Sequence, residues 1–142
     1  MPPRWTAQWI EPYEAEPREV QRPAHHVATD FHVPDEVLSA SLRFTAHGLV
    51  EAFVNGIRVG EDELLPGFTA YRERLEVHTY DVTDLVARGD NALGVLLSDG
   101  YWRGQHSSAR NTDSYGSTTA VLAELQVALT SGKRLLVATD RS

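Results

Sequence analysis

The stretch that decides the fold runs from Val54 to Gly104 and contains VNGIRVG (54–60), LLPGFTAYRERLEVHTYDVTDL (64–85) and GDNALGVLLSDGYWRG (89–104). Asn55-Gly56 is typical of a two-residue type I′ hairpin, because both central positions need a positive φ, which Asn and Gly tolerate. The segment Asp81–Leu85 predicts one helical turn, with the Asp81 carboxylate able to accept from an amide just beyond it. Between these turn signals lie short apolar runs, which indicates strands joined by tight turns.

The segments on both sides of this stretch alternate apolar and polar residues, which is typical of half-buried strands. In 38–47, we expect Ala40, Leu42, Phe44 and Ala46 to face inward and Ser39, Ser41, Arg43, Thr45 and His47 to face outward. The same alternation covers 25–33 and 120–130, and 135–139 follows as a return strand. Strands at intervals of about ten residues predict an all-β, antiparallel β-sandwich of jelly-roll or galactose-binding-domain type, with at most a short helical turn.

The 142-residue length fits a single domain, which we divide into an N-terminal arm and loop (1–24) and the β-sandwich (25–142). In the arm, Trp5, Ala7 and Trp9 share one face of a short extended segment. The Pro- and Glu-rich stretch that follows is expected to be a surface loop. The polar run from His106 to Thr119 predicts a second, longer loop.

The composition excludes several classes of function. A net charge of −7 and a pI of about 5.3 argue against binding to nucleic acid or to an anionic membrane. There is no cysteine, no signal-peptide-like apolar segment and no run long enough to span a bilayer. We therefore expect a soluble chain, cytoplasmic or secreted, without a disulfide framework.

Catalytic and metal-binding patterns are weak. His106, Ser107 and Ser108 with Asp99 or Asp113 offer the residue types of a hydrolytic triad, but the context of a nucleophile elbow is missing, which favours a solvated polar loop. The acidic groups Glu61–Glu63 and Asp81/Asp84 lack the spacing of a calcium loop, and the six histidines lack zinc-ligand spacing. We predict no cofactor and no metal.

The strongest candidate for ligand binding is Asp99-Gly100-Tyr101-Trp102-Arg103-Gly104. Aromatic faces stack on sugar rings, and Asp and Arg side chains exchange hydrogen bonds with hydroxyl groups, so these residue types suit a saccharide. The competing structural interpretation has one aromatic ring closing the end of the sandwich and Arg103 pairing with a carboxylate. We take Asp99, Tyr101, Trp102, Arg103 and Tyr71 as candidate carbohydrate-binding residues.

Several ordered motifs resemble the N-terminal β-sandwich domain of bacterial α-L-rhamnosidases, glycoside hydrolase family 78. They are Thr45–Gly48, Asn55–Gly60, Leu65–Tyr71, Thr79–Thr83, Gly89–Leu93 and Gly100–Gly104, together with the Trp5/Trp9-Ile10 arm and the Tyr115-Gly116 and Ala120–Leu125 tail. Val50 stands where the family usually has Tyr, Tyr101-Trp102 reverses the commoner order, and Gln105–Ser114 has no counterpart.

The resemblance implies that catalysis by the parent protein, hydrolysis of terminal α-L-rhamnose, belongs to a separate (α/α)₆ barrel. This chain is then expected to be one domain of a larger hydrolase and inactive alone, with the remaining domains as partners and rhamnose-containing saccharides as possible ligands. Three functions stay open: a docking domain that supports the barrel, an autonomous carbohydrate-binding module or a sugar-binding domain of β-galactosidase type, and a free-standing hydrolase that uses the His106 loop.

Overall fold

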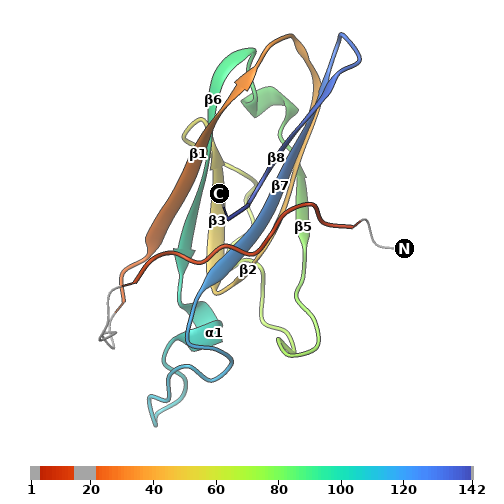
Figure 1. The fold of residues 1–142 in the computed structure, drawn as a ribbon. Coiled ribbons are helices and arrows are strands. Elements are labelled where there is room, and N and C mark those ends of the chain that lie inside the picture. Colours follow the sequence, from red (N-terminus) through yellow and green to blue (C-terminus); the bar gives the residue numbers. More distant parts are fainter. Residues whose placement is uncertain (1–3, 15–21, 142) are drawn as a thin grey trace.

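The structure, a computed structural model, describes residues 4–14 and 22–141, which form a sandwich of two four-stranded antiparallel sheets (Figure 1). One sheet has the order β1-β6-β3-β4 and the other β5-β2-β7-β8. The strands are β1 (His25–Val33), β2 (Val37–His47), β3 (Leu49–Val54), β4 (Ile57–Arg58), β5 (His78–Asp81), β6 (Gly89–Ser98), β7 (Ala120–Leu129) and β8 (Arg134–Ala138). This arrangement confirms the predicted all-β sandwich.

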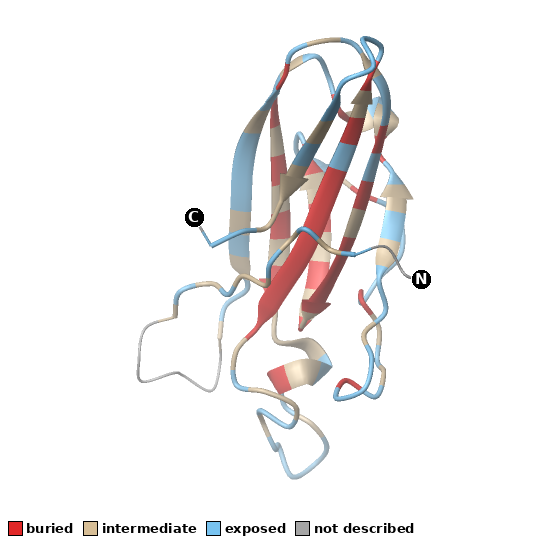
Figure 2. Ribbon diagram, turned by 45° about the vertical axis from the view of Figure 1, so that its right-hand side comes forward, coloured by how far each residue is buried: buried red, intermediate tan, exposed pale blue. Residues whose placement is uncertain are grey.

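The two sheets enclose one apolar core. The inward positions predicted for β2 are all buried, and Leu42 and Phe44 are completely so. They meet Leu97 of β6 and Leu125 of β7, and this burial runs along the length of the sandwich (Figure 2). Because neighbouring side chains along a strand point to opposite faces, the alternation in the sequence was sufficient to identify this core.

The predicted turns are present. Asn55 and Gly56 have φ angles of 51° and 79° and join β3 to β4, where Val54 pairs with Ile57. The short 3₁₀ turn η1 (Thr83–Leu85) follows β5, and the Asp81 carboxylate accepts the Thr83 amide at 2.9 Å. A second single turn, α1 (Gly100–Arg103), follows β6, where the sequence predicted only the end of a strand.

Not all of the outward positions of the second sheet are exposed. Thr45 was expected to face solvent, but it is buried and donates its hydroxyl proton to the Glu76 carbonyl at 2.7 Å. Glu124 on the same face of β7 is also buried. This departure arises because the segment before β5 and the N-terminal arm cover the face, a tertiary effect that alternation does not report.

The arm runs in extended form across the β7–β8 side of the sandwich (Figure 1). Ile10 and Val121 exchange backbone hydrogen bonds of 3.1 and 3.0 Å, and the Gln8 amide donates to the Thr139 carbonyl at 2.7 Å. Part of the predicted loop 11–23 lies outside the described residues. No helix in the described ranges is both long and apolar enough to cross a membrane.

Candidate functional site

One end of the sandwich, next to α1, carries a cluster of aromatic rings that we call the aromatic end. Its members come from five separate segments: the arm, the end of β2, the loop after β4, α1, and the loop between α1 and β7. They are Trp9, His47, Phe68, Tyr71, Tyr101, Trp102, His106 and Tyr115. The chain reversals at the ends of strands bring these segments together, so the cluster is a product of topology.

A three-ring stack forms the inner part of the aromatic end. The His47 imidazole lies between the indoles of Trp9 and Trp102, with ring centroids 4.2 and 4.1 Å apart and planes within 14° and 4° of parallel. The Trp102 indole N–H donates to the Thr118 carbonyl at 2.8 Å, which fixes the orientation of the Trp102 ring. Burial lowers the pKa of His47, although the Glu11 carboxylate opposes that shift. The stack therefore favours a neutral imidazole.

The outer part of the aromatic end is more accessible. Tyr71 is buried between the edges of Phe68, Trp102 and Tyr115, and its hydroxyl donates to the Gly67 carbonyl at 3.1 Å. Burial raises the pKa of this phenol. In contrast, Phe68 is 60% exposed and Tyr101 is 47% exposed, and their rings meet edge to face with centroids 5.3 Å apart. These two rings form an apolar surface held by a rigid base.

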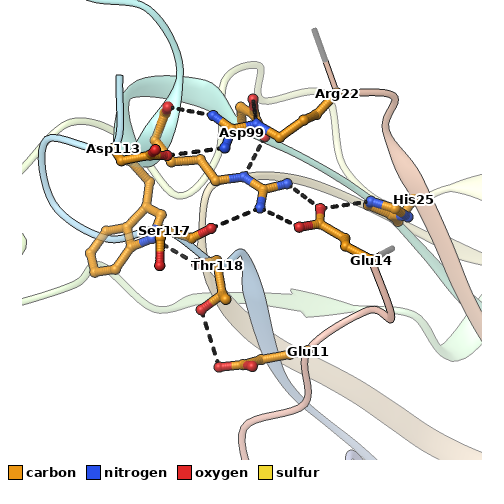
Figure 3. A network of polar contacts seen from close by, with 10 residues as sticks. Glu11, Glu14, Arg22, His25, Asp99, Asp113, Ser117 and Thr118 are labelled. Atoms are coloured by element: carbon orange, nitrogen blue, oxygen red, sulfur yellow. Dashed lines mark hydrogen bonds and ion pairs between the residues drawn. The ribbon is translucent and has the colours of Figure 1, made fainter. Parts of the chain in front are cut away.

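The same end of the sandwich also holds a buried cationic centre, Arg103, whose partners Glu14, Asp99 and Ser117 are labelled in Figure 3. The Arg103 side chain is only 1% exposed and forms ion pairs with Glu14 and Asp99. Its guanidinium also donates to the Ser117 carbonyl at 3.1 Å. The hydrogen bonds from Arg103 lower the pKa of Glu14 to about 2. Because a buried charge without partners is very costly, this centre holds the arm, α1 and the following loop together.

A second arginine extends the network toward solvent. Arg22 donates to Asp99 and Asp113 at 3.0 Å each and to the Arg103 carbonyl at 2.9 Å. Glu14 also contacts His25 Nε2 at 2.9 Å (Figure 3). The long loop between α1 and β7 is thereby tied to residues that precede β1, which limits the movement of the outer rings.

The arm has a separate anchor on the outer face of the second sheet. Glu124 accepts hydrogen bonds from the Thr6 and Ala7 amides and pairs with Arg43, and the Arg43 guanidinium lies 4.0 Å from the centre of the Trp5 ring. Burial alone would raise the pKa of Glu124, but the Ala7 amide, Arg43 and the Thr6 amide together lower it. The carboxylate therefore stays ionised and holds the arm to β7.

The five residues proposed from the sequence lie close together but differ in accessibility. Tyr101 presents its ring to solvent, whereas Trp102 is partly buried in the stack and Tyr71 is buried. The Asp99 carboxylate and the Arg103 guanidinium bind other side chains of the network. A ligand at this end would therefore meet Tyr101 first, and Asp99 and Arg103 would hold the surface in place behind it.

Several members of the aromatic end were not foreseen from the sequence. Phe68, His47 and Tyr115 belong to it, and Glu14 is the main counter-ion of Arg103. Only the pairing of Arg103 with a carboxylate was anticipated, without the identity of the carboxylate. The usable signal was the position of Phe68 directly after Pro66-Gly67, since turn residues bring aromatic side chains to the ends of strands.

The residues considered from the sequence as a hydrolytic triad or as metal ligands are not arranged for either role. His106 Nε2 donates to the backbone carbonyl of Tyr101, and Ser107 Oγ accepts from the Ala109 amide at 3.3 Å. No serine or carboxylate within the described residues aligns this imidazole for nucleophilic catalysis. Within the same ranges, no three His, Cys, Asp or Glu side chains gather as metal ligands.

The sequence of the chain is similar to that of known α-L-rhamnosidases. Residues 35–142 match the family described as "Alpha-L-rhamnosidase N-terminal domain". The chain is 33% identical over 144 residues to an α-L-rhamnosidase from Alteromonas sp. (strain LOR), with 97% of this chain and 16% of the relative covered.

Solved structures give the same result. Native α-L-rhamnosidase from Aspergillus terreus superposes with a TM-score of 0.85 at 36% identity, covering 95% of this chain and 16% of that one. The Streptomyces avermitilis α-L-rhamnosidase complexed with L-rhamnose gives 0.79 at 38% identity, covering 83% and 12%. This chain thus spans about one-sixth of the length of such relatives or less, and it belongs to the α-L-rhamnosidase N-terminal domain family.

Proposed function

We propose that this chain is the accessory β-sandwich of an enzyme that hydrolyses terminal α-L-rhamnose, and that it packs through its aromatic end against the catalytic (α/α)₆ barrel of that enzyme. Its family and the small share of each relative that it covers support a role within a larger protein. In this proposal the (α/α)₆ barrel performs the hydrolysis, and the chain alone has no glycosidase activity.

The observation that carries the docking role is the exposure of Phe68 and Tyr101 on a rigid base. Aromatic side chains dominate the energetics of protein interfaces, where they fill pockets at low cost in conformational entropy. Here the stack of Trp9, His47 and Trp102 and the Arg103 network already fix the surface. A partner would therefore bind these rings without having to order them first.

The arm belongs to the same working unit in this proposal. We assign residues 1–24 as the arm and 25–142 as the sandwich, and the described part of the arm supplies Trp9 to the stack and Glu14 to Arg103. These contacts fix the arm to the sandwich and make the aromatic end one rigid surface. A rigid surface suits a domain that must hold a fixed position on a larger enzyme.

The experiment measures binding between this chain and the separately produced catalytic barrel of the same enzyme by titration calorimetry. Phe68→Ser and Tyr101→Ser should each weaken binding about tenfold or more, since buried aromatic anchors contribute roughly 2 kcal/mol or more. Ile57→Ser is the matched control, because Ile57 is 55% exposed in the β3–β4 hairpin at the opposite end. Equal affinity for all variants, or no binding by the unaltered chain, would overturn the docking role.

A second candidate function is saccharide binding at the aromatic end by Tyr101, with Trp102, Tyr71, Asp99 and Arg103 around it. The exposed Tyr101 ring favours it, because a flat aromatic face stacks on the C–H surface of a sugar. Titration with L-rhamnose, with Tyr101→Ala as the variant, tests this candidate. Heat that saturates and is lost in the variant would support it, and no heat at millimolar sugar would exclude it.

A further inference from the structure

A concave surface lies far from the aromatic end, on the outer face of the β5-β2-β7-β8 sheet. It is a trough of about 530 Å³, within the roughly 300–1,000 Å³ range of small-molecule sites. We call it the outer trough. The lining side chains that could contact a ligand are Ser39, Ser41, Asp81, Gln126, Arg134 and Leu136.

The strand register sets these residues side by side. Ser41 of β2 pairs with Asp81 of β5 and with Gln126 of β7, and Gln126 pairs in turn with Leu136 of β8. Directly opposed residues in antiparallel strands share a face, so these four form one row across the sheet. Ser39, Ala128 and Arg134 form the next row. The small side chains of Ser41 in the first row and of Ser39 and Ala128 in the second leave the surface concave.

The polar groups of the outer trough are available to a ligand. Within the described ranges, the side chains of Ser39, Ser41, Gln126 and Arg134 make no hydrogen bond or ion pair with the protein. Asp81 Oδ1 accepts the Thr83 amide at 2.9 Å and the Thr83 hydroxyl at 2.6 Å, which fixes the carboxylate and lowers its pKa. The ionised Asp81 thus stands at one side of the trough, and Arg134 stands at the other.

This chemistry distinguishes between classes of ligand. The core of a protein interface is rich in aromatic and aliphatic side chains, but Leu136, 45% exposed, is the only large exposed apolar residue among those that line the trough. Hydroxyl, amide, carboxylate and guanidinium groups instead complement a ligand rich in hydroxyls. The charges of Asp81 and Arg134 cancel, and the chain carries a net charge of −7, so a neutral ligand is favoured over an anionic one.

We propose that the outer trough is a binding site for a neutral saccharide, separate from the aromatic end and independent of the docking role proposed above. Asp81 and Gln126 accept hydrogen bonds from sugar hydroxyls, Arg134 and the two serines donate or exchange them, and Leu136 contacts the C–H face of a ring. The arm limits the trough at one side, since Arg43 and Glu124 of the adjacent row are held there by Trp5, Thr6 and Ala7.

The test is nuclear magnetic resonance of the ¹⁵N-labelled 142-residue chain titrated with L-rhamnose and with a neutral α-L-rhamnosyl disaccharide. Saturable shifts of the Ser39, Ser41, Gln126 and Arg134 amides are the expected result, with or without shifts elsewhere. Shifts confined to Phe68, Tyr101 and Tyr115 would overturn the proposal and would support the aromatic end as the sugar site. No saturable shift with either sugar would also overturn it, while leaving the docking role to its own test.

Matched variants complete the experiment. Arg134→Ala and Gln126→Ala should each raise the dissociation constant about fivefold, the typical effect of one hydrogen bond. Both residues are exposed, so these substitutions leave the core intact. Arg72→Ala, an exposed arginine in the loop after β4, makes the same charge change as Arg134→Ala and should leave affinity unchanged. Equal effects of Arg134→Ala and Arg72→Ala would show that only net charge matters and would overturn the site.

Discussion

His47 lies face to face with Trp102, with ring centroids 4.1 Å apart and planes only 4° from parallel. Trp9 covers the other face of the same imidazole at 4.2 Å. These three rings belong to the arm, to β2 and to α1, so one histidine links segments that are distant in the sequence. The protonation state of this imidazole should therefore affect the attachment of the arm.

The first prediction concerns pH. Because burial lowers the pKa of His47, the unfolded chain takes up a proton at this site at a higher pH than the folded chain. The stability contribution is fully present above the usual pKa of 6.5 and is lost as pH falls from there through the lowered value. Urea unfolding at pH 8 and pH 5 should show this loss, and His47→Phe, which keeps a stacking ring, should reduce it.

The control for this prediction is His26→Phe, at an exposed position of β1. Its free energy of unfolding should depend on pH as that of the unaltered chain does. The Glu11 carboxylate, which favours the charged imidazole, is the opposing group, so Glu11→Gln should enlarge the loss. A pH dependence that His47→Phe leaves unchanged would contradict the assignment.

The second prediction concerns Arg103. Arg103→Met should lower the free energy of unfolding by about 3–5 kcal/mol, because it leaves Glu14 and Asp99 without their buried partner. Chemical denaturation at neutral pH measures the loss, and Arg72→Met is the control at an exposed arginine. Adding Glu14→Gln to Arg103→Met should recover part of the loss, and a double variant no more stable than the single one would argue against the pairing.

The same ion pair predicts an acid transition. The pKa of Glu14 is lowered from 4.5 to about 2, so its contribution is present above pH 4.5 and disappears as pH falls toward 2. The free energy of unfolding of the unaltered chain should therefore fall as the pH is lowered from 5 to 2. Glu14→Gln should reduce this dependence of the free energy of unfolding on pH, whereas Glu73→Gln, at an exposed loop position, should leave it unchanged.

The third prediction concerns the anchor of the arm. Glu124→Gln removes the charge that holds Arg43 and the Thr6 and Ala7 amides, and it should cost about 2 kcal/mol. The arm should also loosen, which is visible as a red shift of tryptophan fluorescence as Trp5 and Trp9 become hydrated. Glu61→Gln, an exposed carboxylate, is the matched control, and an unshifted spectrum in Glu124→Gln would show that the arm is held in another way.

The fourth prediction concerns Gly48, which joins β2 to β3. Its φ is +129°, and a Cβ at this position would overlap the Ser98 carbonyl oxygen, so Gly48→Ala combines backbone strain with a steric clash. We expect a loss of more than about 3 kcal/mol in thermal unfolding. Gly132 also has a positive φ, +89°, but open space around it, so Gly132→Ala should lose only about 1 kcal/mol.

The parts of the fold that the sequence predicted depend on neighbouring residues. Asn55-Gly56 makes its turn through its own φ angles, and the alternation from Ala40 to Ala46 follows from the geometry of a single strand. The family motifs lie in the same segments. Such features need no knowledge of where the rest of the chain lies, and all of them were found.

The site was predicted less completely because its partners are distant in the chain. Arg103 and Glu14 are 89 residues apart, and Glu124 and Thr6 are 118 apart. No local pattern marks a glutamate as the counter-ion of one particular arginine, and no alternation shows that an arm will cover Thr45 or Glu124. Tyr101 and Trp102 were identified by composition, whereas His47 and Phe68 joined them only through the packing of loops.

The pairing of β1 has a practical consequence for anyone who produces this domain. The family match begins at residue 35, after β1 has ended at Val33. Yet β1 pairs with β6 along all nine of its residues. A recombinant fragment trimmed to 35–142 would turn β6 into an open edge, with a row of unpaired amides and carbonyls that invites aggregation. A fragment made for purification and study should therefore retain β1.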